Sequence, residues 1–185
     1  MSKVANNKIL QLLCPNRYYN TISEVDDREL DDLGIEGIII DLDNTLIPYY
    51  RRQVDEATMQ WLQKAQENNF KLCIVSNNFA SHGEGLARQL NIPAIWSAVK
   101  PRRRSFKRAL QIMELSPQKV AVIGDQMFTD ILGGNRLGMY TILVVPLSQK
   151  ELLWTKAMRA AESRLLHFFS EQGMLKQSSA RSQRS

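Results

Sequence analysis

The stretch IIIDLDNTLIPYY, residues 38–50, decides how the rest of the sequence is interpreted. Its three isoleucines favour a buried strand, and they lead directly into Asp41 and Asp43, which are separated by one leucine. Residues two apart on an extended chain point the same way, so both carboxylates could face one ligand. Burying two like charges so close together is costly unless a cation holds them. The stretch therefore predicts a metal-dependent site, with an ordinary polar strand end and an Asx turn as the alternative.

Strand-like and helix-like stretches alternate along the middle of the chain. The strand-like stretches are rich in apolar and β-branched residues, whereas the others repeat their apolar residues every three or four positions. We expect strands at 34–41, 70–78, 93–98, 119–125 and 140–146, and helices at 55–69, 81–91, 104–116 and 127–138. This order predicts an α/β fold, a Rossmann-like parallel sheet with helices on both faces. Ligands of such sheets bind beyond the carboxyl ends of the strands.

The chain is expected to have four regions and no cap domain. These are an N-terminal arm and first helix region at 1–35, a catalytic domain at 36–146, an amphipathic helix at 147–173 and a disordered tail at 174–185. Neither of the gaps at 42–75 and 77–99 can house a cap, because even small domains need about 50 residues. An uncapped site suits a phosphate presented on something large, such as a lipid in a bilayer, a protein or a nucleic acid end.

Composition restricts the partner and the compartment without choosing a function. The net charge of +5 and the pI of about 9.3 favour an anionic partner, such as a phosphorylated compound, a nucleic acid or an acidic membrane surface. Cys14 and Cys73 are interpreted as buried thiols in a reducing compartment. No stretch approaches the ~18 consecutive apolar residues of a membrane span, and the N-terminus has no cleavage pattern. We expect a cytoplasmic protein, or one attached peripherally to the cytosolic face of a membrane.

Two later strand ends carry residues suited to phosphate binding. Ser76 and Asn77 follow an apolar run, and a hydroxyl with backbone N–H groups at such a turn can hold phosphate oxygens. The same residues are also typical of an ordinary loop and N-cap. Lys100 precedes Pro101, which keeps the lysine out of the following helix, and its ammonium could bridge a carboxylate and a phosphate. The arginines at 102–104 are either a solvated basic face or part of a phosphate site, and the sequence does not decide between these roles.

The fourth expected strand ends in Gly124 and Asp125, and Asp130 follows five residues later. Glycine permits a tight turn, and Asp125 could complete a metal shell with Asp41 and Asp43. Asp130 would act behind the metal ligands or through water, or would simply interact with the helix dipole. Carboxylate oxygens suit Mg²⁺, which would neutralise a site where carboxylates meet an anionic phosphate. Four such motifs in order, each at a strand end, favour chemistry over four unrelated structural features.

This order of motifs resembles the haloacid dehalogenase superfamily of phosphatases. The family pattern is Asp-x-Asp-x-Thr, then Ser or Thr, then a lysine, then Gly-Asp with a second acidic residue. It is matched by Asp41, Asp43 and Thr45; by Ser76; by Lys100; and by Gly124, Asp125 and Asp130.

The resemblance implies a role for each matching residue. Asp41 would be the nucleophile that forms an aspartyl-phosphate, and Asp43 the general acid and then the base that activates water. Mg²⁺ would be bound by the Asp41 side chain, the Asp43 backbone carbonyl and Asp125, with Asp130 as a further metal-site residue. The expected phosphate-binding residues are Ser76, Asn77 and Lys100.

The segments LLCPNRYYNTI, GIEGIIIDLDNTLIPY, IVSNN and GDQMFTDILGGNRLGMYTILVVP look like the YqeG family. That family is related to mitochondrial and plastid phosphatidylglycerophosphate phosphatases. The likeness implies this lipid as substrate, in phosphatidylglycerol synthesis. The same chemistry on a nucleic acid end, a phosphoprotein or a small phosphate ester is the alternative. A non-enzymatic binding module is disfavoured, because it would not need the complete set of motifs. A nucleic acid partner is not expected, and the sequence does not indicate an oligomeric state.

The C-terminal helix has an apolar stripe whose partner the sequence leaves open. A membrane interface is one possible partner, and the sheet or a partner subunit is the other. We favour the membrane, because the helix follows the completed sheet, a basic tail follows the helix, and an enzyme acting on a lipid must reach the bilayer. The stripe comprises Trp154, Met158, Ala161, Leu165 and Phe168, while Lys156, Arg159 and Arg164 lie largely off it.

Overall fold

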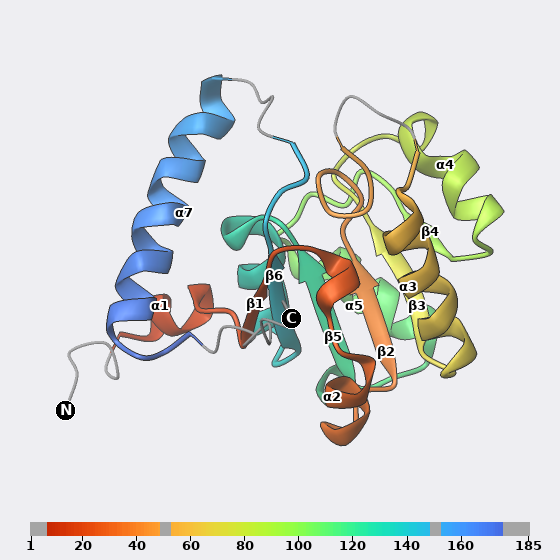
Figure 1. Cartoon of the computed structure of the whole chain (residues 1–185), viewed down its shortest axis with the longest axis horizontal. Coiled ribbons are helices and arrows are strands. Elements are labelled where there is room, and N and C mark those ends of the chain that lie inside the picture. Colours follow the sequence, from red (N-terminus) through yellow and green to blue (C-terminus); the bar gives the residue numbers. More distant parts are fainter. Residues whose placement is uncertain (1–6, 49–52, 149–152, 176–185) are drawn as a thin grey trace, which may run out of the picture.

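The computed structural model describes residues 7–48, 53–148 and 153–175, with the backbone alone for His82 and 153–159. Its centre is a sheet in which every strand pair is parallel, in the order β1-β6-β5-β2-β3-β4 (Figure 1). The strands are β1 (Arg17–Tyr19), β2 (Gly37–Ile40), β3 (Lys71–Val75), β4 (Ala94–Ile95), β5 (Val120–Gly124) and β6 (Tyr140–Val144). The predicted α/β fold with a parallel sheet is confirmed.

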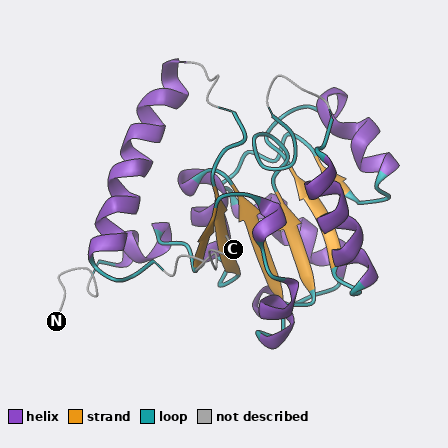
Figure 2. Cartoon of the chain, in the orientation of Figure 1, coloured by secondary structure: helices purple, strands orange, loops and turns teal. Residues whose placement is uncertain are grey.

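Helices cover both faces of this sheet (Figure 2). They are α1 (Lys8–Leu13), α2 (Asp27–Asp32), α3 (Glu56–Glu67), α4 (Ala80–Gln89), α5 (Arg103–Met113), α6 (Leu132–Asn135) and α7 (Leu153–Glu171). Two 3₁₀ turns, η1 (Ile22–Glu24) and η2 (Pro117–Lys119), and one π-helical turn, η3 (Met127–Ile131), complete the described elements. Helix α3 lies in the gap after β2 and helix α4 in the gap after β3. A small domain would not fit beside either helix.

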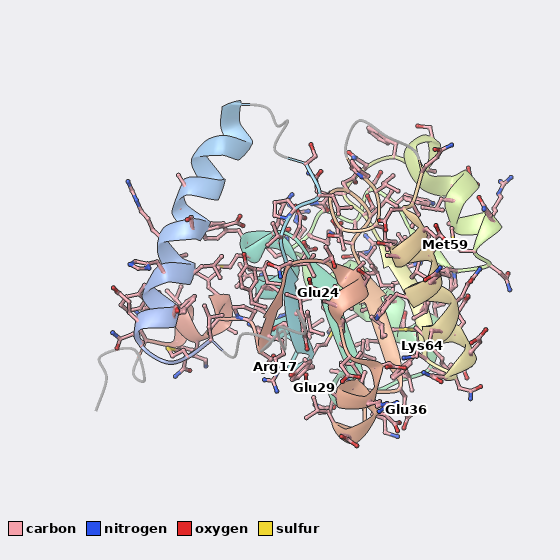
Figure 3. The ribbon with its side chains drawn as sticks, viewed as in Figure 1. Arg17, Glu24, Glu29, Glu36, Met59 and Lys64 are labelled. Atoms are coloured by element: carbon pink, nitrogen blue, oxygen red, sulfur yellow. The ribbon has the colours of Figure 1, made fainter. Side chains whose placement is uncertain are left out.

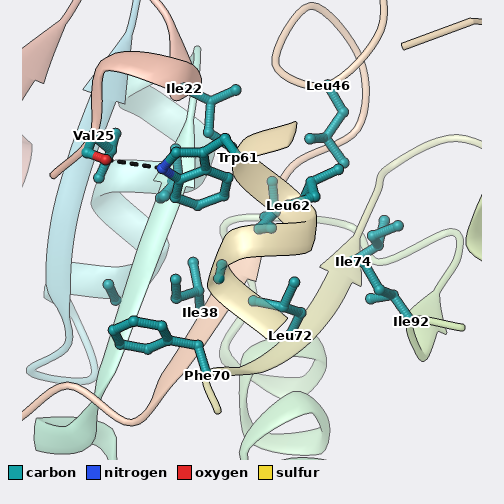
Figure 4. Packing of buried hydrophobic residues seen from close by; sticks show 14 of the residues in the cluster. Ile22, Val25, Ile38, Leu46, Trp61, Leu62, Phe70, Leu72, Ile74 and Ile92 are labelled. Atoms are coloured by element: carbon teal, nitrogen blue, oxygen red, sulfur yellow. Dashed lines mark hydrogen bonds between the residues drawn. The ribbon is translucent and has the colours of Figure 1, made fainter. Parts of the chain in front are cut away.

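The alternation of side chains along β2 divides the core between the two faces of the sheet. Ile38 belongs to the cluster that includes Trp61 and Leu62 of α3, whereas Ile39 belongs to the cluster that includes Phe106 of α5. This period of two is what an extended strand imposes. The indole N–H of Trp61 donates to a backbone carbonyl, that of Val25, at 2.8 Å, so its one polar group is satisfied (Figure 4).

The N-terminal region adds an edge strand to the sheet. Strand β1 pairs with β6, and the carboxylate of Glu29 on α2 connects the two strands. Glu29 forms an ion pair with Arg17 (Figure 3). It also accepts hydrogen bonds from the hydroxyls of Tyr19, at 2.9 Å, and Tyr140, at 3.3 Å. The pairing of β1 with β6 and the Glu29 carboxylate therefore attach part of the segment expected as an arm to the domain.

The described part of α7 packs on the domain. Phe169 is fully buried in a cluster with Met127 and Ile131, and Leu165 and Phe168 are half-buried against it. Two members of the expected stripe, Leu165 and Phe168, thus lie against the domain, whereas a third, Ala161, is exposed. Of the residues expected in or beside that stripe, Trp154, Met158, Lys156 and Arg159 have side chains outside the described residues, as does tail segment 176–185. In the described residues, no helix is both long enough and apolar enough to cross a membrane.

The strand order creates a switch point beside β2. From β2 the chain builds β3 and β4 on one side, and then returns to place β5 and β6 on the other side. Loops leaving β2 and β5 therefore diverge, which opens a crevice beyond their carboxyl ends, where open α/β sheets bind ligands. Asp41 follows β2 directly and Asp125 follows β5 directly.

The packing of α7 predicts the result of deleting one aromatic ring. Phe169→Ala should lower the free energy of unfolding by about 3–5 kcal/mol, because it removes a ring that is wholly inside the core. Phe168→Ala, which deletes the same ring from a half-buried position, should cost clearly less. Chemical denaturation of the full chain measures both values. Equal and small losses would mean that this part of α7 does not pack on the domain.

Candidate active site

Pairing between β2 and β5 extends one residue past the end of β2. The Asp41 backbone N–H donates to the carbonyl of Ile123 at 2.9 Å, which holds Asp41 against β5. The chain then turns sharply, with Asn44 at φ 60° and the Leu46 N–H donating to the Leu42 carbonyl at 2.9 Å. The turn brings the Thr45 hydroxyl within 3.3 Å of Asp41 Oδ2, to which it donates. The matched Asp-x-Asp-x-Thr motif is thus a strand end followed by a tight turn.

The Lys100 ammonium lies between two carboxylates at this edge. Its Nζ is 2.5 Å from Asp41 Oδ1 and 2.7 Å from Asp130 Oδ1. The three residues are buried, with relative exposures of 7% for Lys100, 6% for Asp41 and 2% for Asp130. Since one buried charge would be very unfavourable without partners, the three groups depend on one another for their charged states.

Burial acts on both partners of the Lys100–Asp41 pair, with different results. It raises the pKa of the Asp41 carboxyl to about 7, an effect that the Lys100 ammonium only partly offsets and the Asp130 carboxylate reinforces. Burial by itself lowers the pKa of Lys100, but the carboxylates of Asp130 and Asp41 outweigh it, so this pKa lies above its ordinary value. We infer an ammonium–carboxylate pair, because opposite charges within hydrogen-bond distance favour each other's charged form in a buried site.

Three carboxylates converge closely enough to share a cation. One oxygen each from Asp41, Asp125 and Asp130 lie within 4.8 Å of one another, and all three residues are buried. Oxygen ligands of this kind suit Mg²⁺, so the residues present fit a divalent cation. The Asp43 side chain is not a member of this group, and only its backbone carbonyl is implied by the family resemblance.

The predicted phosphate-binding residues Ser76 and Asn77 lie at the same edge. The Ser76 hydroxyl donates to Asp43 Oδ2 at 3.1 Å and accepts the Asn78 N–H at 3.0 Å. Asn77 Oδ1 accepts the backbone N–H of Lys100 at 2.7 Å. Asn77 thus fixes the main chain of the lysine, while Ser76 orients the second aspartate of the motif.

Asp130 reaches the site through an unusual turn. Residues 127–138 were expected to form one helix, but Met127–Ile131 form a π-helical turn before α6 begins. Such turns are frequent at functional sites. Asp130 Oδ2 accepts the Gln126 N–H and the Thr129 hydroxyl, both at 3.3 Å, while its Oδ1 contacts Lys100. The Asp130 carboxylate therefore stabilises its own turn through Oδ2 and pairs with the Lys100 ammonium through Oδ1.

Glu162 of α7 also stabilises this π-helical turn, through hydrogen bonds to its backbone. Its Oε1 accepts the N–H of Met127 at 2.7 Å and that of Phe128 at 3.4 Å, and the residue is only 5% exposed. These N–H groups open a helical element and have no partner within it. Glu162 could not be found from the sequence, because a carboxylate that caps the backbone of a distant segment leaves no pattern of residues.

The assembled groups can perform phosphoryl transfer to a carboxylate. Asp41 offers a carboxylate beside a fixed cation, and Asp43 offers a second, half-buried carboxylate two residues along. The arginines at 102–104 are exposed and lie outside this buried cluster.

Known proteins resemble the chain over both halves of this site. A family model for haloacid dehalogenase-like hydrolases matches residues 38–99, and a HAD-hydrolase-like model matches 98–146. The chain is 37% identical to "Probable phosphatase YqeG" of Bacillus subtilis over 86% of its own length and 92% of that protein. It is 23% identical, over 89% of its own length, to "Phosphatidylglycerophosphate phosphatase 1, chloroplastic/mitochondrial" of Arabidopsis thaliana, and it spans 50% of that protein.

A solved structure assigned to the HAD family of hydrolases, from Streptomyces avermitilis, shares the fold. It matches with a TM-score of 0.51 at 15% identity, over 76% of this chain and 78% of that one. The extent and identity of the Bacillus subtilis match, together with the two family models, show that the chain belongs to the YqeG family of haloacid dehalogenase-like phosphatases.

Proposed function

We propose that this protein is a Mg²⁺-dependent phosphomonoesterase that works through an aspartyl-phosphate and acts on phosphatidylglycerophosphate. The observation that carries the chemistry is the position of the Lys100 Nζ, held between the buried carboxylates of Asp41 and Asp130 at the switch point of the sheet. The site is placed where the fold binds ligands, and it contains a nucleophile, a fixed cation and a second carboxylate for proton transfer.

In the first step an Asp41 oxygen attacks phosphorus, and the bond between phosphorus and the ester oxygen breaks. Asp43 donates a proton to the departing oxygen, so the alcohol leaves neutral and Asp43 becomes a carboxylate. The Ser76 hydroxyl, 3.1 Å from Asp43 Oδ2, keeps that side chain oriented. Lys100 neutralises part of the charge on Asp41 and the phosphate, which reduces their repulsion.

In the second step water replaces Asp41 on phosphorus. Asp43 accepts a proton from the water, the new phosphorus–oxygen bond forms, and the Asp41 carboxylate is released with inorganic phosphate. When bound, Mg²⁺ would neutralise charge between carboxylate and phosphate. Asp41, Asp125 and Asp130 would hold it, because their oxygens already converge in a buried group.

The open edge of the site supports a substrate larger than a free metabolite. In the described parts of the two gaps where a cap domain could be inserted, α3 and α4 are the only helices, and strands β3 and β4 fill much of the remainder. A relative named for phosphatidylglycerophosphate hydrolysis matches most of the chain, which supports a lipid headgroup as the source of the phosphate. We place the protein in the cytoplasm, acting peripherally on the cytosolic face of a membrane.

The nucleophile assignment predicts the effect of a near-isosteric change. Asp41→Asn should reduce phosphate release to background, because the amide cannot attack phosphorus, while the fold persists. Asp43→Asn should lower kcat by roughly 10²–10⁴-fold through loss of general acid–base catalysis. Steady-state phosphate release with Mg²⁺ measures both, and circular dichroism checks folding. Activity of Asp41→Asn near the wild-type level would contradict the assignment.

The close approach of Gly124 to Asp130 allows a test of whether catalysis needs the observed position of the Asp130 side chain. A Cβ at Gly124 would lie 2.3 Å from Asp130 Cγ, so Gly124→Ala must push the Asp130 side chain away from Lys100. We expect kcat to fall by about 10²-fold, the loss typical of a catalytic group displaced by an ångström.

Gly85→Ala is the matched control, because a Cβ there meets nothing within 4 Å and the residue lies inside α4. It should stabilise the fold by about 0.5–1 kcal/mol and leave kcat unchanged. Equal activities of the two variants would show that Asp130 does not need its observed position.

The lipid assignment predicts an order of substrates. Phosphatidylglycerophosphate dispersed in detergent should give the highest kcat/KM in a panel with a nucleotide, a sugar phosphate and a phosphorylated oligonucleotide. Phosphate release at equal Mg²⁺ measures the order. A soluble member of the panel that surpasses the lipid would reject the lipid substrate but would leave the phosphatase chemistry intact.

A further inference from the structure

Five exposed residues gather around the open edge of the site, and we call them the docking rim: Phe79, Val99, Arg102, Arg103 and Arg104. They lie in the loop before α4, in the loop before α5 and in the first turn of α5. The Ser97 N–H donates to the Asn78 carbonyl at 2.9 Å, which joins the two loops, and the Arg102 N–H donates to the Val99 carbonyl at 3.0 Å within the second loop. Because the strands are parallel, both loops lie at the carboxyl edge, which is the upper edge of the sheet in Figure 1.

The helix that Phe79 begins does not explain the identity of this residue. It is the N-cap of α4, makes no side-chain capping bond there and is 76% exposed. Large apolar residues are poor N-caps. By contrast α1, α2 and α3 begin at Asn7, Asp26 and Asp55, whose side chains accept backbone N–H groups. A large exposed aromatic ring at such a position is better explained by something it contacts outside the chain.

The three arginines are similarly unfavourable for the helix they begin. Arg102 is the N-cap of α5 and makes no side-chain capping bond, and Arg103 and Arg104 occupy its first turn, which contains no acidic residue. Cations at a helix N-terminus oppose the helix dipole. Within the described parts of the chain, none of the three forms an ion pair. An anionic partner would offset this unfavourable arrangement.

Val99 adds a second exposed apolar side chain immediately before Lys100. It is 54% exposed, and its φ of 54° is rare for a β-branched residue. In this conformation Val99 lies at the surface while the next side chain, Lys100, is buried in the site. The rim therefore presents apolar groups and cations together, one residue away from the proposed phosphate-binding lysine.

We propose that the docking rim seats the protein on an anionic lipid bilayer, with Phe79 and Val99 in the interfacial layer and the arginines on lipid phosphates. The inference rests on the proposed function, since it explains how an uncapped site meets a phosphate carried by a membrane lipid. Apolar and aromatic residues beside cations are the combination that interfacial binding uses, and cations near an anionic leaflet each add to the binding. Nucleic acid is the less suitable partner, because its phosphates would engage the arginines but offer no apolar layer for Val99.

The rim is tested by sedimentation of the full chain with vesicles of phosphatidylcholine containing phosphatidylglycerol. Phosphatidylglycerol carries no phosphate monoester, so binding to these vesicles does not depend on catalysis. We expect binding at about 50 mM salt that weakens at about 500 mM through screening. R102Q/R103Q/R104Q should lose on the order of 10²-fold in partition coefficient and most of the salt dependence. Phe79→Ser should lose about tenfold at both salt concentrations.

Matched controls lie at the opposite edge of the molecule. R28Q/K71Q/K119Q removes the same charge from exposed positions near the amino ends of the strands, and Ile112→Ser removes an apolar side chain that is 44% exposed. Both should bind vesicles like the wild type. A rise in melting temperature on addition of Mg²⁺, equal in all variants, would show that the metal site is intact in each.

Each result of these vesicle experiments either supports or overturns the proposed role of the docking rim. Equal losses of vesicle binding in the rim and control variants would mean that net charge alone drives binding, and would overturn the proposed role of the docking rim. So would wild-type protein that ignores anionic vesicles at low salt, or that binds a single-stranded oligonucleotide in their place. If the rim variants lose binding as expected while phosphatidylglycerophosphate in detergent is not hydrolysed, the docking inference stands and the proposed substrate fails.

Discussion

The buried contact of one ammonium with two carboxylates is the constraint on which the rest of the site depends. Lys100 pairs with Asp41, at the end of β2, and with Asp130, in the turn after β5. Removing one partner of such a buried pair typically costs 3–5 kcal/mol, because the remaining charge has lost its hydration. Three segments distant in sequence are therefore held together by charge, and the same charges are those that phosphoryl transfer requires.

The C-terminal helix supports this centre from outside the sheet. Phe169 anchors α7 in the cluster beside β6, and Glu162 caps the turn that carries Asp130. The described part of α7 is thus connected to the turn that carries Asp130 through the Glu162 carboxylate and through the apolar cluster around Phe169. The docking rim belongs instead to the loops that follow β3 and β4 and to the first turn of α5, and the contacts described for α7 do not involve it.

The parallel sheet and the strand-end residues were predictable because both follow from strong local patterns. A β-branched run that stops at Asp41 or Asp125 marks a strand end, and parallel strands bring such ends to one edge. Strand β1 was missed, because three residues are too few for a periodic signal. For Asp130 the sequence offered two roles, and the direct contact with Lys100 depends on a π-helical turn that has no signature in the residues.

The sequence also could not show what the apolar stripe of α7 contacts. Its apolar stripe is compatible with either a core or a membrane, and only tertiary contacts distinguish them. The expected stripe included Phe168, whereas Phe169 is the buried ring, a shift of one position along the helix. Glu162 acts on backbone N–H groups, which every residue except proline possesses, so no pattern of side chains reveals such a partner.

The proposed mechanism requires that the phosphoryl group passes through Asp41. Its most direct test is to quench turnover of phosphatidylglycerophosphate with acid, reduce the protein with borohydride and locate the modified residue by mass spectrometry. An acyl phosphate at Asp41 would be reduced to homoserine at that position alone, and this product should form only when substrate and Mg²⁺ are both present. Turnover without modification of Asp41, or modification of a different residue, would contradict this mechanism.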